Sequence, residues 1–277
     1  SDDAAVVIVP VPYDGTSTWI KGADRGPEAL IEASTQMELY DIETRIEACS
    51  VGIHTDAPVL DFPNPESMVQ SVYDRVFKWL DRGKMVVSVG GEHSISIGAV
   101  QAYLNHYSNM SVLQFDAHAD LRDSYNGSPF NHACVAARLS EGCVVTQVGV
   151  RSMDVSEDRE FENVHTFTAY RLKEDPSWTR DMLSTLKEHV YITFDLDVFD
   201  PSFMPSTGTP EPGGMVWHDV LDVLRLVINH RKLVGFDIVE LCPNPLNKAP
   251  DFMAAKLLYK ILSYHFSKEK NESKKVT

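Results

Sequence analysis

The stretch Met110-Ser-Val-Leu-Gln-Phe115-Asp116-Ala-His118-Ala-Asp120 decides the interpretation of this chain. Its first six residues are an apolar run of the kind that forms a buried strand. Asp116, His118 and Asp120 follow at alternating positions, and alternate side chains on extended backbone point the same way. Because unpaired charge beside a core is costly, we expect these three side chains to converge on a cation at the end of the strand.

Three further apolar runs of strand type also end in acids or imidazoles. In an open parallel α/β sheet, ligands bind in the crevice at the carboxyl ends of the strands. The sequence therefore predicts an active site at this edge of the sheet. The three runs and the polar residues that follow them are 84–89 with Glu92 and His93, 190–194 with Asp195 and Asp197, and 233–239 with Glu240.

The order of elements along the chain predicts an α/β fold. Strand and helix patterns alternate with short connections, which indicates βαβ units and a mostly parallel sheet with helices on both faces. Residues 1–266 show no linker or repeat and are expected to form one domain, whereas the polar, Lys-rich residues 267–277 are expected to be a disordered tail. The expected strands are 4–11, 85–89, 110–115, 144–150, 190–194 and 233–239, and the expected helices are 26–39, 66–79, 94–107, 132–139, 178–188, 217–229 and 252–266.

Composition is that of a globular enzyme. The chain has 277 residues, of which 43% are hydrophobic and 23% charged, so it can bury a large core. Its net charge of −15 argues against a nucleic-acid partner, because phosphate binding needs clustered Lys and Arg. No stretch is long and apolar enough to cross a bilayer. The first residues lack the basic and apolar regions typical of a signal peptide, and the four cysteines form no Cys-x-x-Cys pair. We therefore expect a cytoplasmic protein with free thiols.

The polar residues at the strand ends favour two metal ions over one. They supply two imidazoles and four carboxylates, more than one ion needs when water must also reach it. Oxygen donors with one imidazole per ion and no thiolate suit Mn²⁺ or a related first-row metal. A site with a single Mg²⁺ is the alternative, and His93 alone would be a hydrogen-bonded core histidine. The candidate ligands are His93, Asp116, His118, Asp120, Asp195 and Asp197.

Several segments together resemble the signatures of the ureohydrolase family, which contains the arginases and agmatinases. The resemblance extends from Val11 to the last helix and implies a three-layer α/β/α domain around a parallel sheet. The resembling segments are Gly90-Gly91-Glu92-His93-Ser94, Asp116-Ala-His118-Ala-Asp120, Asp195-Leu-Asp197-Val-Phe-Asp200-Pro201 and Gly208-Thr-Pro-Glu-Pro-Gly213-Gly214.

The resemblance also implies how the ligands divide between two ions, usually manganese. One departure is Glu92, where the family more commonly has aspartate, so the orientation of His93 is open to adjustment. Asp116 and Asp195 would bridge the ions. One ion would take His93, Asp116, Asp120 and Asp195, and the other would take Asp116, His118, Asp195 and Asp197.

The expected chemistry is attack of a hydroxide, bridging the two ions, on the carbon of a guanidino group. Glu240 matches the glutamate of the family that binds the guanidinium by paired hydrogen bonds. His132 matches the proton-shuttling histidine, although Ala133 follows it where the family commonly has glycine. Asp120 is counted with these two as catalytic, as well as being a ligand.

The loops favour agmatine, hydrolysed to putrescine and urea, as the small cationic guanidino substrate; this reaction belongs to polyamine biosynthesis. Residues 121–130 and 207–214 look more like those of agmatinases than the carboxylate-binding loop of arginases. Glu211 is a candidate contact for the free amine of the substrate. Aminopropylagmatine, guanidinobutyrate and arginine remain open.

Two other functions compete with this interpretation. A metal-dependent deacetylase normally has one zinc ion and adjacent histidines, and this sequence contains no His-His dipeptide. An inactive homologue with a binding role would be expected to lack ligands, yet all six are present. Relatives usually form trimers or hexamers, so the resemblance also implies a homo-oligomer.

Overall fold

An eight-stranded sheet forms the centre of the molecule, and every neighbouring pair of its strands is parallel. The computed structural model describes residues 3–60 and 62–276, and from 273 onward only the backbone. The predicted parallel sheet is confirmed. Across the sheet, the strands are β4 (Ile53–Thr55), β1 (Val6–Val11), β5 (Met85–Gly90), β10 (Lys232–Val239), β9 (His189–Asp195), β6 (Met110–Phe115), β7 (Val144–Val150) and β8 (Val164–Thr168).

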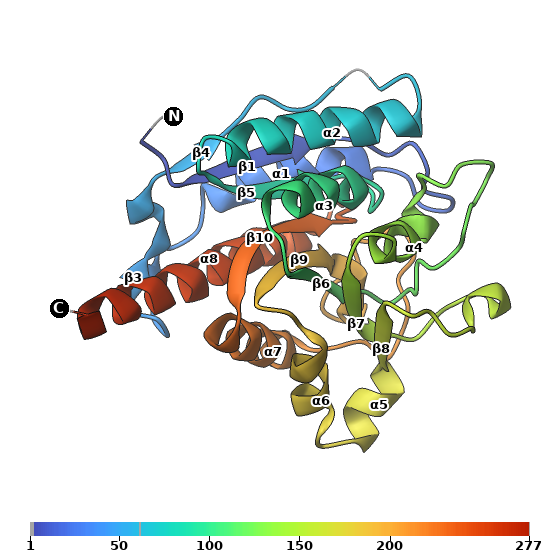
Figure 1. Ribbon diagram of the computed structural model, residues 1–277. Coiled ribbons are helices and arrows are strands. Elements are labelled where there is room, and N and C mark those ends of the chain that lie inside the picture. The colour runs from blue at the N-terminus through green and yellow to red at the C-terminus, as the bar shows by residue number, and fades with distance from the viewer. Residues whose placement is uncertain (1–2, 61, 277) are drawn as a thin grey trace.

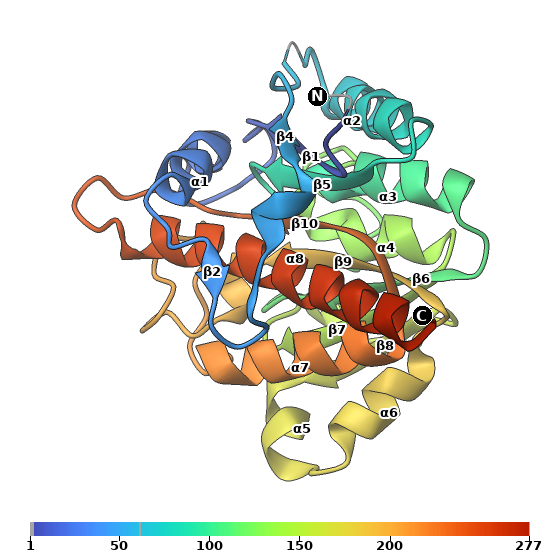
Figure 2. The ribbon, with the colours of Figure 1, turned by 90° about the vertical axis from the view of Figure 1, so that its left-hand side faces the viewer.

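Helices cover both faces of the sheet, which confirms the three-layer α/β/α arrangement. Figures 1 and 2 show α2 and α3 on one side of the sheet and α7 and α8 on the other. The first layer contains α2 (Pro65–Leu80), α3 (Ile95–His106) and α4 (Val135–Ser140), and the second contains α1 (Gly26–Ser34), α5 (Ala169–Glu174), α6 (Trp178–Thr185), α7 (Trp217–His230) and α8 (Ala249–Val276).

The core is divided by the sheet into two apolar layers. In β6, Leu113 and Phe115 pack into the layer beneath α7 and α8, whereas Met110 and Val112, at the alternate positions, pack into the layer beneath α2 and α3. This alternation follows from the period of two in extended backbone. Because both faces are buried, the strands appear in the sequence as continuous apolar runs, as is typical of parallel sheets.

The segments that connect the strands and helices contain a small hairpin and several 3₁₀ turns. A small hairpin of β2 (Tyr40–Asp41) and β3 (Ile46–Glu47) lies against α8, where the buried Nζ of Lys260 is 2.7 Å from a carboxylate oxygen of Asp41 and 2.7 Å from one of Glu43. The 3₁₀ turns are η1 (Ala23–Arg25), η2 (Ala48–Val51), η3 (His132–Cys134), η4 (Val155–Glu157) and η5 (Leu196–Val198).

Several elements depart from expectation. α1 ends at Ser34, before the predicted 39, and α6 ends at Thr185, before the predicted 188. The edge strands β4 and β8, the hairpin of β2 and β3, and the short helix α5 were not predicted. α8 continues to Val276, so the segment expected to be a disordered tail is helical through 276; Thr277 lies outside the described residues. Its Lys and Glu residues are good helix formers. No helix among the described residues combines the length and apolar character needed to cross a bilayer.

Candidate metal centre and active site

The four central strands of the sheet carry the polar residues singled out in the sequence. β5, β10, β9 and β6 are neighbours in that order. The register keeps their ends level, because Phe115 of β6 is paired with Phe194 of β9, and Asp195 of β9 with Val239 of β10. Residues that follow these strands therefore start from adjacent points in space, although they are distant along the chain.

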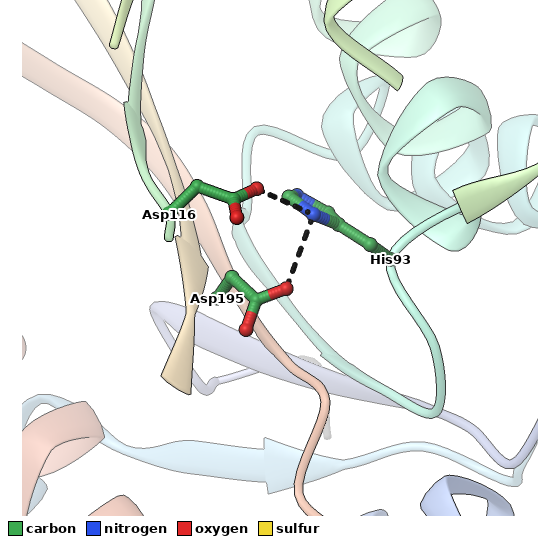
Figure 3. A group of neighbouring side chains, drawn as sticks. All are labelled: His93, Asp116 and Asp195. Atoms are coloured by element: carbon green, nitrogen blue, oxygen red, sulfur yellow. Dashed lines mark ion pairs between the residues drawn. The ribbon is translucent and has the colours of Figure 1, made fainter. Parts of the chain in front are cut away.

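The first set of candidate ligands, the His93 group, consists of His93, Asp116, Asp120 and Asp195. Nδ1 of His93 lies 3.1 Å from an oxygen of Asp116, 3.1 Å from one of Asp120 and 3.3 Å from one of Asp195. Figure 3 shows the carboxylates of Asp116 and Asp195 directed at the imidazole ring. All four residues are buried.

The second set, the His118 group, consists of Asp116, His118 and Asp197. Nδ1 of His118 lies 2.8 Å from Asp197 Oδ2 and 3.7 Å from Asp116 Oδ1. Asp116 therefore belongs to both sets, with Oδ2 facing His93 and Oδ1 facing His118. Within Asp116, His118 and Asp197 the potential ligand atoms all lie within 4.8 Å of one another. The structure thus brings the six predicted ligands together around two positions.

The hydrogen bonds of His93 fit a metal ligand. Its Nε2 lies 2.9 Å from Thr193 Oγ1, and that hydroxyl donates to Asp237 Oδ1 at 2.8 Å. Thr193 therefore accepts from Nε2–H, which leaves the lone pair on Nδ1. Nδ1 is buried and has no hydrogen-bond partner among the described residues, although three carboxylate oxygens surround it. A cation among these atoms would satisfy all of them.

The electrostatics of the cluster also favour a cation. Burial raises the pKa of Asp195 well above its usual range, and the charges of Asp197 and Asp116 add to that rise. Burial and the charge of Asp116 raise the pKa of Asp120 to about 7. These carboxylates repel one another in a small buried volume, and a divalent ion would stabilise their charged forms together.

Two site residues hold their backbone in the left-handed region, with φ at +53° for Asp120 and +68° for Glu240. Residues with a side chain are disfavoured there by roughly 1–3 kcal/mol, and such strain is concentrated at functional sites. The buried Glu240 accepts a hydrogen bond at Oε1 from the backbone N–H of His93 at 2.7 Å. The strained backbone thus places a carboxylate next to the His93 group.

His132 lies in η3, which begins where the Asn131 side chain accepts a hydrogen bond from the backbone of Ala133. Burial lowers the pKa of the His132 imidazole to about 4, and the neighbouring His118 and His93 act in the same direction. The ring is therefore neutral at neutral pH and can accept a proton.

A cavity of about 270 Å³ gives access to the cluster. Its lining includes His118, Asp197, His132 and Glu240. Glu211 is not among the described residues that line it, and its carbonyl oxygen accepts a hydrogen bond from Arg151 Nη2 at 2.6 Å. Contact between Glu211 and a substrate therefore stays a prediction that this geometry does not support.

Three residues that support the site had no recognisable signal in the sequence. Thr193 and Asp237 orient His93 through the hydrogen bonds that run from its Nε2 to Thr193 and on to Asp237, but in the sequence they look like ordinary positions of two apolar strands. Arg151 follows β7 and donates to the carbonyl oxygens of Asp197 at 2.8 Å and Glu211 at 2.6 Å. It therefore ties the turn that carries a candidate ligand to the 207–214 loop.

Comparisons with known proteins agree with this geometry. A model of the family described as "Arginase family" matches residues 4–263. The chain is 39% identical to the N(1)-aminopropylagmatine ureohydrolase of Synechocystis sp. over 95% of this chain and 89% of that protein. It is 34% identical to an agmatinase of Pyrococcus horikoshii over 94% of this chain and 92% of that protein.

Solved structures show the same fold. The agmatine ureohydrolase of Thermoplasma volcanium superposes with a TM-score of 0.88 at 30% identity, covering 98% of this chain and 92% of that one. Both the sequence relatives and the solved structure span nearly the full length of the described chain. The resemblance seen in the sequence motifs is confirmed: this chain belongs to the arginase family and is an enzyme of its ureohydrolase type.

Proposed function

We propose that the chain hydrolyses the guanidino group of agmatine, with putrescine and urea as products. The observation that carries the proposal is the position of Glu240, whose buried carboxylate lines the same cavity as His118 and Asp197 of the His118 group. His132 lines this cavity as well. A planar cation can therefore lie on a carboxylate, beside metal-ligating groups and within reach of an imidazole.

Glu240 is suited to hold the guanidinium. Its Oε1 is fixed by the His93 N–H, and a Cβ added to Gly208 would lie 3.5 Å from Oε2, so this oxygen faces the 207–209 turn. Burial, together with the charge of Glu92, raises the pKa of Glu240 well above its usual range. A bound guanidinium would favour the charged carboxylate and form two parallel hydrogen bonds with it.

We propose that the His93 group and the His118 group hold two Mn²⁺ ions. Their donors are carboxylate oxygens and imidazole nitrogens, without a thiolate. When bound, such a pair of ions supplies a strong oxygen nucleophile at neutral pH. The remaining work belongs to side chains of the protein: Glu240 positions the guanidino carbon, and the neutral ring of His132 accepts a proton released by the attacking oxygen and passes it to the departing amine nitrogen as the C–N bond breaks.

A second candidate substrate is N(1)-aminopropylagmatine, which is named in the description of the Synechocystis relative. The mouth of the cavity offers room for a longer amine. Trp19 is 70% exposed and Met153 is 43% exposed, and both line the cavity together with Asp154. Aromatic and apolar walls with one carboxylate suit a methylene chain that carries an ammonium group.

Measuring urea release in the presence of Mn²⁺ tests the proposal directly. We expect agmatine or N(1)-aminopropylagmatine to be the preferred substrate over arginine and guanidinobutyrate. Glu240→Gln should lower kcat/KM by about 100-fold or more, since a charged pair in a buried site is lost. Glu141→Gln, at an exposed position, is the matched control and should leave the rate unchanged. Absence of urea with every guanidino compound would defeat the proposal.

Three further expectations rest on the family resemblance. We propose that the protein forms a trimer or hexamer, that it acts in polyamine biosynthesis, and that it functions in the cytoplasm. Light scattering coupled to size-exclusion chromatography tests the first, and a monomer at micromolar concentration would contradict it.

A further inference from the structure

Thr16, in the segment after β1, connects two residues of the site that are distant in sequence. Its hydroxyl donates to Oε1 of Glu92 at 2.8 Å. The hydroxyl oxygen of Thr16 in turn accepts the backbone N–H of His132 at 3.0 Å and lies 3.1 Å from His132 Nδ1. Thr16 is 8% exposed, and Glu92 is fully buried. A continuous chain of contacts therefore runs from Glu92 through Thr16 to the imidazole.

The direction of these hydrogen bonds is determined by the donors around Glu92. Besides the Thr16 hydroxyl, the carboxyl group faces the Thr16 backbone N–H at 3.2 Å, the Ser94 backbone N–H at 2.7 Å and the Ser94 hydroxyl at 2.9 Å. Backbone N–H groups can only donate, and a carboxylate only accepts. The single hydrogen of the Thr16 hydroxyl is therefore directed to Glu92, which leaves the Thr16 oxygen as the acceptor for His132.

The segment that carries Thr16 is held firmly against the one that carries Glu92. The backbone N–H of Glu92 donates to Tyr13 O at 2.8 Å, and that of Gly91 donates to Val11 O at 2.9 Å. A Cβ added to Gly91 would lie 1.8 Å from Tyr13 O, so only glycine permits this approach. The Gly90-Gly91-Glu92 motif thus serves to bring Thr16 and Glu92 into contact.

We propose that Glu92 and Thr16 are positioning residues that fix the tautomer and the orientation of His132. With Nδ1–H donated to Thr16, the lone pair of the ring is on Nε2, which is the nitrogen left for the cavity that His132 lines. The catalytic consequence of this tautomer rests on the proposed function, in which His132 transfers a proton. The tautomer itself follows from the contacts of Thr16 with Glu92 and His132. The carboxyl group of Glu92 contacts both Ser94 and Thr16.

The test compares Thr16→Val, which has nearly the same shape but no hydroxyl, with Thr16→Ser, which retains it. Thr35→Val is the matched control, because the exposed Thr35 bonds only within its own helix region. Nitrogen-15 spectra of the full chain, loaded with diamagnetic Zn²⁺ at neutral pH, report which ring nitrogen of His132 is protonated. His132→Gln identifies its signals. Urea release and thermal unfolding are measured on the same variants with Mn²⁺.

We expect protonated Nδ1 and unprotonated Nε2 in the wild type, in Thr16→Ser and in Thr35→Val. In Thr16→Val the ring should become a mixture of tautomers, and kcat should fall about 10-fold to 100-fold with little change in KM, the range for losing one buried hydrogen bond. A wild-type ring protonated at Nε2, or an unchanged ring in Thr16→Val, overturns the proposal. If the wild type releases no urea, the proposed function fails, and the nitrogen spectra still decide the tautomer.

Discussion

Replacing Asp116 with asparagine should weaken the binding of both metal ions, whereas replacing His118 with alanine should weaken one. Asp116 is the residue shared by the two groups, with Oδ2 at 3.1 Å from His93 Nδ1 and Oδ1 at 3.7 Å from His118 Nδ1. Asparagine keeps an oxygen donor but removes the charge. One unit charge about 4 Å from another contributes about 4 kcal/mol at an effective dielectric constant of 20, which corresponds to about a 1000-fold change in each dissociation constant.

Titration calorimetry with Mn²⁺, together with metal analysis after dialysis, checks this expectation. Wild-type protein should retain two ions per chain, His118→Ala one, and Asp116→Asn none at micromolar free metal. Asp123→Asn is a suitable control, since Asp123 is exposed and pairs only with Arg159 among the described residues. If Asp116→Asn bound two ions with an affinity within tenfold of the wild type, Asp116 would not be a ligand shared by both ions. If His118→Ala lost both ions, the His93 group and the His118 group would not bind their ions separately.

Three other expectations follow from contacts of His132, Lys260 and Asp41. His132→Asn should lower kcat by about 100-fold to 10,000-fold, the usual contribution of a general acid or base, with a smaller effect on KM in a steady-state urea assay. Lys260→Met should lower the free energy of unfolding by about 3–5 kcal/mol, because buried Asp41 loses its partner at 2.7 Å. Denaturant titration measures this loss, and replacing an exposed lysine with methionine is the control that should show none. Burial raises the pKa of Asp41, but the hydrogen bonds from Lys260 and Thr44 outweigh it and lower that pKa below 3.8. Its stabilisation is therefore complete only above about pH 5, well above the unfolded-state pKa of about 3.9, and disappears as the pH falls through the folded-state pKa, so Asp41→Asn should flatten the decline in unfolding free energy below pH 5.

The elements that could be predicted are those with strong local patterns. β6 was predicted with its observed bounds, and β5 and β9 within one residue, because buried parallel strands form continuous apolar runs bounded by polar residues. β4 and β8 escaped prediction because they are short edge strands with partly exposed residues, and their pairing depends on the neighbour rather than on their own composition. The end of α8 was misplaced because a polar helix has little apolar periodicity beyond Phe266.

The residues that act on the site through other residues could not be predicted. Asp237 is one polar residue inside an apolar run, and nothing in the run shows that Thr193 of a different strand lies 2.8 Å from it. The position of Thr16 beside His132 is equally hidden, since 116 positions separate them. Such contacts depend on which strands are neighbours, and a sequence pattern shows only which strands exist.

The sequence by itself determined the chemical character of this protein: the six candidate ligands, Glu240 and His132 each follow a recognisable segment, and alternating strands and helices specify a parallel sheet. Only the tertiary structure decided how these segments meet. The strand order β5-β10-β9-β6 places four strand ends side by side, and it gives Asp116 to both ligand groups. The physical reason is that strand and helix periodicities are local, whereas strand order is decided by burying both faces of the sheet at once.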